Sequence, residues 1–375
     1  MEFNIDVQEL QYVVKLLALT AVRNTTDTKG RILIEAKDNK VLFLSNNGNV
    51  AIEYYSDTSE IKNEGITSIV LNNLYSFILP FQPWNGIFGS DRARIKTTKN
   101  ALNIFIDYKF EDGSTSKNKL RLDLWDTAIA RPDRFGNANI ILNSHTMKIA
   151  ITKVLYAIDP GEVRGPLQGM RVDFDEEHVN FVGTTGVMLS EYKIKTDTEV
   201  DSFTSKHDFM NVLSKALPAD DTQLFIEVDD SKIRAKFGNV YIEGSQNIGH
   251  EYPKYKSALD SFTDTILLNK KAMSASLAPI QEILDQDDNC RITMHIKDKK
   301  MRIFSENTDF EYDGELDYDK EFIADLNGRL LKQTIDAIAG DDLVLRCSDE
   351  DSALIFDSAI HENQNSLLTP IKRRS

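Results

Sequence analysis

The 375-residue chain is poor in the features that mark covalent staples, metal sites and membrane spans. Its two cysteines, Cys290 and Cys347, fit neither a disulfide framework nor a zinc-ligand spacing, so we expect two buried thiols and no metal. The apolar run VVKLLALTAV is broken by Lys15 and is too short to span a bilayer. The start MEFNIDVQEL lacks the basic segment of a secretory signal. These absences predict a cytoplasmic protein with no membrane partner.

Catalytic and nucleotide-binding motifs are also missing. The six histidines are scattered, and the chain contains no H-E-x-x-H, G-x-S-x-G or C-x-x-C pattern. The stretch GTTG at 183–186 lacks the lysine and Ser/Thr of a phosphate-binding loop and ends a predicted strand, which favours a turn or bulge. Acidic clusters at 285–288 and 349–351 are typical of solvated turns. We expect neither an enzyme nor a bound cofactor.

What the chain does contain is an internal repeat. Six times, a short strand leads into an amphipathic helix, which is followed by strands that alternate around a charged turn. The predicted helices span 7–23, 72–84, 144–158, 205–217, 268–284 and 326–338. Because two repeats fill an ordinary domain, the sequence predicts three similar α+β domains, at 1–136, 137–262 and 263–375.

The charge is distributed unevenly between these elements. A formal net charge of −15 argues at first against a nucleic-acid partner. The six predicted helices, however, carry ten basic and four acidic residues, a net charge of +6. We therefore expect basic helical surfaces backed by acidic sheets, although any single lysine is explained equally well by the solvated face of a helix.

Several short motifs follow one another in the order and spacing of a known family. They are M-x-F-x-I at 1–5, T-M-K at 146–148, V-R at 163–164, L-Q-G at 167–169, TTGVML at 184–189, Y-P-K-Y at 252–255 and T-P-I at 369–371. Together they span the whole chain. In this respect the chain resembles the bacterial β sliding clamp, the processivity factor of the replicative DNA polymerase.

The resemblance implies three DNA-clamp domains, each built from two strand–helix–strand units, with the helices lining a ring and antiparallel sheets outside. Six helices about 10 Å wide, set side by side, leave an opening of about 9 Å, whereas twelve leave about 28 Å. A B-form duplex of about 20 Å passes only the larger opening. The family's closed head-to-tail homodimer, in which the first domain meets the third domain of the partner, supplies twelve helices.

Basic residues of the helices and of one loop are the candidates for sequence-independent contact with the phosphates of double-stranded DNA. The resemblance points to Arg23, Lys148, Arg164 and Lys206, and the helical pattern alone adds Lys153, Lys215, Arg329 and Lys332. A solvated surface role without DNA remains open for each of them.

A second surface is implied by the resemblance: an apolar pocket for peptide motifs of the DNA polymerase and of other replication and repair proteins. Its members by position are Leu167, Thr184, Gly186, Leu189, Pro253, Ala258, Leu367, Thr369, Pro370 and Ile371. Here the family's His-Arg is Val187-Met188, and its arginine after P-D-Y-R is Ser257, which predicts a more apolar pocket.

Two further expectations follow. Because the chain has no nucleotide-binding motif, the resemblance implies a separate ATP-dependent clamp loader as a partner. The competing hypothesis is a scaffold of repeated β-rich domains that recruits peptides and does not bind DNA.

Overall fold

The computed structural model describes residues 1–22, 25, 27–79, 87–110, 114–198, 200–247, 251–260, 262–284, 290–305, 309–312, 316–349, 352–360 and 363–372. For residues 87–91, 108–110 and 279–284 only the backbone is described. The chain forms two compact units. The first comprises 1–148 and 208–246, and the second comprises 149–207 and 247–375. No helix of the described part is long and apolar enough to cross a membrane.

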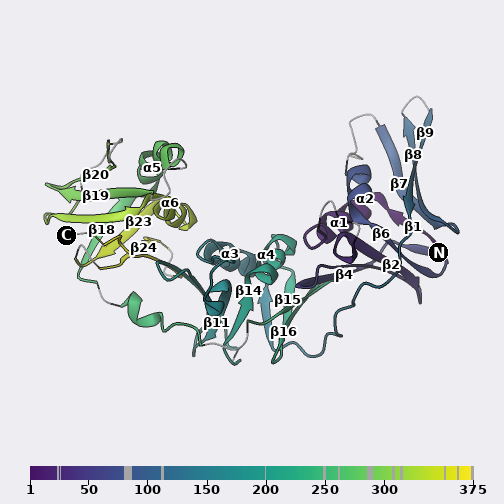
Figure 1. Cartoon of the computed structure of the whole chain (residues 1–375), viewed down its shortest axis with the longest axis horizontal. Coiled ribbons are helices and arrows are strands. Elements are labelled where there is room, and N and C mark those ends of the chain that lie inside the picture. Colours follow the sequence, from purple (N-terminus) through teal and green to yellow (C-terminus); the bar gives the residue numbers. More distant parts are fainter. Residues whose placement is uncertain are drawn as a thin grey trace. The chain divides into compact units, whose positions relative to one another are not determined.

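The predicted repeat is present as six strand–helix–three-strand motifs, which follow one another along the chain (Figure 1). The first two are β1 (Glu2–Asp6), α1 (Val7–Leu17), β2 (Arg31–Lys37), β3 (Lys40–Asn46) and β4 (Val50–Ser56), then β6 (Gly65–Val70), α2 (Leu71–Ile78), β7 (Ile87–Thr97), β8 (Ala101–Phe110) and β9 (Thr115–Asp123). A short extra strand, β5 (Glu60–Asn63), lies between these motifs in the sequence.

The middle two motifs are β10 (Ile140–Asn143), α3 (Ser144–Leu155), β11 (Gly169–Phe174), β12 (His178–Thr184) and β13 (Met188–Lys195), then β14 (Phe203–Lys206), α4 (His207–Ala216), β15 (Gln223–Val228), β16 (Lys232–Phe237) and β17 (Val240–Ser245). The last two are β18 (Asp264–Asn269), α5 (Lys270–Leu284), β19 (Arg291–Lys297), β20 (Lys300–Phe304) and β21 (Asp309–Glu311), then β22 (Phe322–Asn327), α6 (Gly328–Ala337), β23 (Asp342–Cys347), β24 (Leu354–Ser358) and β25 (Gln364–Leu368).

Every strand pairing in the described part is antiparallel. The first unit holds a five-stranded sheet, β5-β1-β7-β8-β9, and an eight-stranded sheet, β10-β15-β16-β17-β4-β3-β2-β6. The second unit holds an eight-stranded sheet, β14-β11-β12-β13-β25-β24-β23-β18, and a four-stranded sheet, β21-β20-β19-β22. In both eight-stranded sheets the central pairing, β4 with β17 or β13 with β25, joins segments that are far apart in the sequence.

Helices α1 and α6 begin where a strand ends on a short polar side chain. The Asp6 carboxylate accepts hydrogen bonds from the backbone N–H groups of Gln8 and Glu9 at 2.8 and 3.0 Å. The Asn327 side chain does the same at the start of α6. Such caps satisfy N–H groups that have no partner within the helix, and they explain why the chain turns from strand to helix at these positions.

The helices bury one apolar face each. In α1 the buried residues include Leu10, Val13, Val14 and Leu17, at helical spacing. Helix α1 packs beside α2 in the first unit, and α5 packs beside α6 in the second (Figure 1). The predicted α+β class with repeated antiparallel sheets is confirmed.

Some details differ from the sequence-based expectation. Helix α1 ends at Leu17 rather than at residue 23, because the chain turns there and the Thr20 hydroxyl donates to the Leu17 carbonyl at 3.3 Å. Residues 80–84 of the second predicted helix lie outside the described residues. Cys290 and Cys347 are buried thiols, as predicted. The division into three domains at 136 and 262 stays a prediction.

The GTTG stretch has a packing role. Gly183 lies in β12 against helix α3, and a Cβ atom there would come within 2.7 Å of the Ile158 side chain and 2.9 Å of the Val154 carbonyl oxygen. Gly186 has a φ of +90°, which disfavours other residues. Gly186 therefore allows the tight turn that the sequence predicts, and Gly183 allows close packing that the sequence did not indicate.

Replacing Gly183 with alanine is expected to destabilise the fold by about 1–3 kcal/mol, because α3 must move away from β12. Urea unfolding measures this loss. Gly161→Ala is the matched control, since its new Cβ would meet only the flexible Asp159 side chain, at 3.3 Å. Equal midpoints for the two variants would contradict the packing role.

Candidate functional site

The structure describes seven of the eight predicted phosphate-contact residues, and these differ in exposure and in their contacts within the chain. Lys206 at the end of β14, Lys215 in α4 and Arg329 in α6 have exposed side chains. Their exposure makes these three side chains accessible to a ligand. Arg23 lies outside the described residues.

Lys148, Lys153 and Lys332 already have partners within the chain. Lys148 Nζ donates to the Leu217 carbonyl oxygen at 2.8 Å. Lys153 Nζ donates to the carbonyl oxygen of Ala337, the last residue of α6, where a cation is favoured by the helix dipole. Burial, together with the charge of Lys270, lowers the pKa of Lys153. The Lys332 ammonium is paired with Asp336. A phosphate would have to compete with these contacts.

Arg164 connects the two predicted surfaces. Its guanidinium binds the Glu162 carboxylate through Nε and Nη2 at 3.0 Å each and donates to the Thr185 carbonyl at 2.8 Å. The hydrogen bonds from Arg164 hold the pKa of Glu162 at about 2. A Cβ on Gly186 would lie 3.0 Å from the guanidinium nitrogens, so the arginine lies directly against this glycine. The sequence did not indicate that a predicted DNA contact and a predicted pocket residue touch.

Two apolar members of the predicted pocket are brought together in the second unit. Leu189 of β13 pairs with Leu367 of β25, and both belong to a buried cluster with Val182, Tyr255 and Ile355. Tyr252 and Leu259 pack on the same cluster. The segment 251–260 thus covers the leucines, which are only 5% and 6% exposed.

The remaining predicted pocket residues differ in exposure. Leu167 and Thr184 are buried, and the Thr184 hydroxyl donates to the Met188 carbonyl at 2.7 Å. Thr369 is exposed, and its N–H donates to the Val187 carbonyl at 2.8 Å. Pro253, Ala258 and Gly186 are exposed, Ile371 is half-buried, and Pro370 is buried. The structure therefore gathers an apolar floor with an exposed rim.

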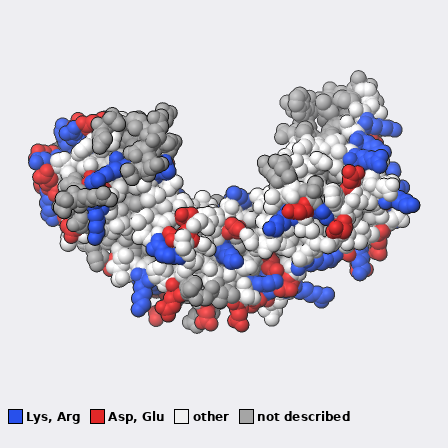
Figure 2. Space-filling model, in the orientation of Figure 1, with Lys and Arg blue, Asp and Glu red and all other residues white. Residues whose placement is uncertain are grey.

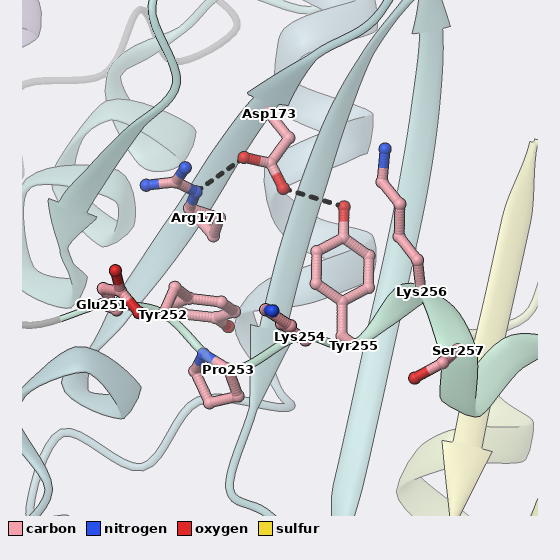
Figure 3. Close-up of a pocket in the computed structure, with 9 residues that line it drawn as sticks. All are labelled: Arg171, Asp173, Glu251, Tyr252, Pro253, Lys254, Tyr255, Lys256 and Ser257. Carbon is pink, nitrogen blue, oxygen red and sulfur yellow. Dashed lines mark hydrogen bonds and ion pairs between the residues drawn. The ribbon is translucent and has the colours of Figure 1, made fainter.

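An open cavity of about 910 Å³ lies beside this floor (Figure 3). Of the predicted residues it includes only Pro253; its lining is Arg171, Asp173 and the segment Glu251–Ser257. Arg171 Nε and the Tyr255 hydroxyl both donate to the Asp173 carboxylate, at 2.6 and 3.0 Å. Within the family motif Y-P-K-Y at 252–255, the sequence assigned only Pro253 to the pocket. Arg171 and Asp173 gave no signal, because they read as ordinary strand residues.

The surface charge departs from the expected pattern in one place. Figure 2 shows Lys and Arg side chains gathered over the strands that Figure 1 labels β7, β8 and β9. These include Arg92, Arg94 and Lys96 on β7 and Lys119 on β9, all at least partly exposed. The expectation of an acidic sheet surface does not hold for this sheet.

Among the residues that the structure describes, no group of three or more His, Cys, Asp or Glu side chains is placed to hold a metal ion. The acidic stretch 285–288 lies outside those residues.

Comparisons with known proteins bear on the whole chain. No protein-family model matches it. It is 18% identical to the β sliding clamp of Helicobacter pylori over 98% of this chain and 96% of that protein. It is 24% identical to the β sliding clamp of Buchnera aphidicola over 63% of this chain and 66% of that protein.

Solved structures show the same fold at full length. The DNA polymerase III subunit beta of Pseudomonas aeruginosa matches with a TM-score of 0.86 at 14% identity, and each chain is covered completely. The DNA polymerase sliding clamp of Bacillus subtilis matches with a TM-score of 0.85 at 15% identity, again with complete coverage. The resemblance drawn from the sequence motifs is confirmed, and the chain has the fold of the β sliding clamps.

Proposed function

We propose that this chain is a DNA sliding clamp, which encircles duplex DNA without sequence specificity and tethers the replicative DNA polymerase. The observation that carries the proposal is the fold match with DNA polymerase III β subunits along the entire chain. The role is mechanical and not enzymatic. It places the protein in the cytoplasm, with an ATP-dependent clamp loader as a partner.

The helices supply the inner surface in this proposal. Lys206, Lys215 and Arg329 have exposed side chains that meet phosphates, and salt-sensitive contacts of this kind exchange along the backbone without reading bases. Lys148, Lys153 and Lys332 contribute less, since their ammonium groups are already bound within the chain. Weak contacts suit sliding, because no single phosphate position is strongly preferred.

Ring closure requires a second copy, since six helices leave too narrow an opening for a duplex. Two strands at the ends of their sheets offer surfaces on which the two copies can pair. Strand β9, with Lys117, Lys119 and Arg121, ends the five-stranded sheet of the first unit, and β21, with Asp309 and Glu311, ends the four-stranded sheet of the second unit. We infer that β9 of one copy pairs with β21 of the other, so that backbone groups and opposite charges are both satisfied.

The partner-peptide site is proposed at the apolar floor of Leu189 and Leu367 and its exposed rim, Val187, Thr369 and Pro253. A partner side chain that displaces part of the segment 251–260 reaches the buried leucines. One P. aeruginosa clamp is described as bound to griselimycin, which makes this compound a usable probe.

A scaffold that recruits peptides without DNA would share this pocket but would have no use for a closed ring. The two functions are separated by topological trapping. With protein loaded by a bacterial clamp loader onto nicked circular DNA, we expect complexes that survive high salt and are lost when the circle is linearised. Equal, salt-sensitive retention on circular and linear DNA would contradict encirclement and favour the scaffold.

Dimer closure is tested by exchanging charges between the two edges. We expect Asp309→Lys with Glu311→Lys to weaken the dimer, because β21 would then repel the basic β9. Adding Lys117→Glu and Arg121→Glu to the same chain is expected to restore it. Sedimentation equilibrium measures the assembly. Dimers of unchanged affinity in the first variant, or no rescue in the second, would rule out this edge pairing.

The pocket is tested by calorimetric titration with griselimycin. We expect binding at one site per chain and a loss of about tenfold or more in Val187→Asp, whose carboxylate would stand at the rim of the apolar floor. The control is Ile360→Asp, since Ile360 is also exposed in the second unit but lies at the opposite end of the β24–β25 hairpin. Equal affinities for the two variants would place the site elsewhere.

A further inference from the structure

Segment 251–260, which we call the strap, covers the apolar floor of the proposed peptide site in the second unit. Tyr255 belongs to the apolar cluster of that floor, and Tyr252 and Leu259 pack on the same cluster. The remaining residues of the strap are exposed. The side chains that turn toward the sheet are therefore two tyrosines and a leucine.

The seam of the first unit, between β4 and β17, is built on the same plan as the seam between β13 and β25. Each seam follows a turn whose glycine has a positive φ, +91° at Gly48 before β4 and +90° at Gly186 before β13. A segment also crosses the first seam: residues 128–131 line a cavity with Ala51 and Glu243, which face each other across the β4–β17 ladder. The attachments of the two crossing segments can therefore be compared.

The crossing segment of the first unit, residues 125–136, is held by charged groups. The Asp133 N–H donates to the Glu243 carboxylate at 3.0 Å, and the Asp133 carboxylate accepts from Lys232 at 2.6 Å. The Tyr241 hydroxyl donates to the Asp133 carbonyl at 2.8 Å. Main-chain groups and ion pairs thus fix this segment to its sheet at the same point.

The strap is attached in a different way. In the described part of the second unit, no backbone hydrogen bond and no ion pair joins it to the sheet beneath. The Tyr255 hydroxyl donates to the Asp173 carboxylate at 3.0 Å, and the Tyr252 hydroxyl donates to the Val182 carbonyl at 3.3 Å. Figure 3 shows the side chains of Tyr255 and Arg171 both reaching Asp173. Two hydroxyl groups are therefore the polar attachment of the strap.

The surroundings of the strap leave room for it to move. Backbone hydrogen bonds to the sheet are made on either side of it, by the N–H groups of Asn247 and Thr263. The open cavity of about 910 Å³ is lined by residues 251–257 together with Arg171 and Asp173. Because a close-packed interior resists rearrangement and an open cavity does not, the strap can shift between its two fixed ends once the tyrosine contacts are lost.

We propose that the strap is an autoinhibitory lid over the peptide site, and that the hydrogen bond between Tyr255 and Asp173 is its latch; this rests on the partner-peptide site proposed above. Arg171 is a positioning residue, since it holds the Asp173 carboxylate at 2.6 Å. An apolar side chain of a partner takes the place of the tyrosine rings on the leucine floor, so that one buried apolar contact replaces another. The latch sets the affinity, because binding must also break it.

Amide hydrogen exchange of the full-length protein, with griselimycin as the probe, distinguishes a lid from a fixed wall of the site. We expect exchange in 251–260 to become faster when griselimycin is bound, because the strap leaves the sheet, while exchange in β13 and β25 does not. A ligand that binds beside an unmoved strap would slow exchange in 251–260 or leave it unchanged. Either of these results would overturn the proposal.

The latch is tested by Tyr255→Phe, which removes the hydroxyl and keeps the ring. Griselimycin is expected to bind this variant about three- to tenfold tighter, because one hydrogen bond no longer opposes opening. Asp173→Ala, which removes the acceptor, is expected to act in the same direction. The matched control is Tyr241→Phe, which removes the corresponding hydroxyl at the first seam and is expected to leave the affinity unchanged. Circular dichroism establishes that each variant folds.

The outcomes separate the lid from the function that it would regulate. A tyrosine with a purely structural role would give equal or weaker binding in Tyr255→Phe, and that result overturns the lid while the peptide site stands. Binding that appears only in Tyr255→Phe supports a lid that is closed in the parent protein. No binding in any variant overturns the lid and the peptide site together. Trapping on circular duplex DNA is independent of all these results.

Discussion

The structure depends on two antiparallel pairings that join distant parts of the chain, β4 with β17 and β13 with β25. Each pairing makes one eight-stranded sheet from two smaller sets of strands, and each leaves fewer free edges than separate sheets would. Because these pairings join strands of different repeats, the repeats are packed as parts of larger units and not as separate modules. The compact units accordingly cut through the middle repeats.

The distribution of charge also follows from this arrangement. A cation on a helix binds a DNA phosphate less readily when its charged group is already bound within the protein. The ammonium groups of Lys153 and Lys270, for example, donate hydrogen bonds to carbonyl oxygens at the C-terminal end of α6. Exposed cations on β7 and β9 are, by contrast, concentrated on a sheet face in an otherwise acidic chain. The total charge is therefore a poor guide to where a polyanion binds, because local excess decides the field that a ligand meets.

At the peptide site too, a suitable residue type does not by itself make a side chain accessible to a ligand. Leucines 189 and 367 are adjacent as expected, yet the tyrosines of the segment 251–260 cover them. The covering residues are held in place: the Tyr255 hydroxyl binds Asp173, and the Tyr252 hydroxyl binds the Val182 carbonyl. Access to the apolar floor is thus linked to the order of this segment, which also lines the cavity at Arg171 and Asp173.

The sequence by itself determined the six repeats, the alternation of apolar residues in strands and helices, and the buried state of both cysteines. These depend on local periodicity and on residue type, which act within a few residues. Only the tertiary structure decided that Arg164 lies against Gly186, that Lys148 and Lys153 bind carbonyls, and that Arg94 and Lys119 flank Phe105. Those contacts join residues up to 184 positions apart, and strand register rather than spacing in the sequence brings them together.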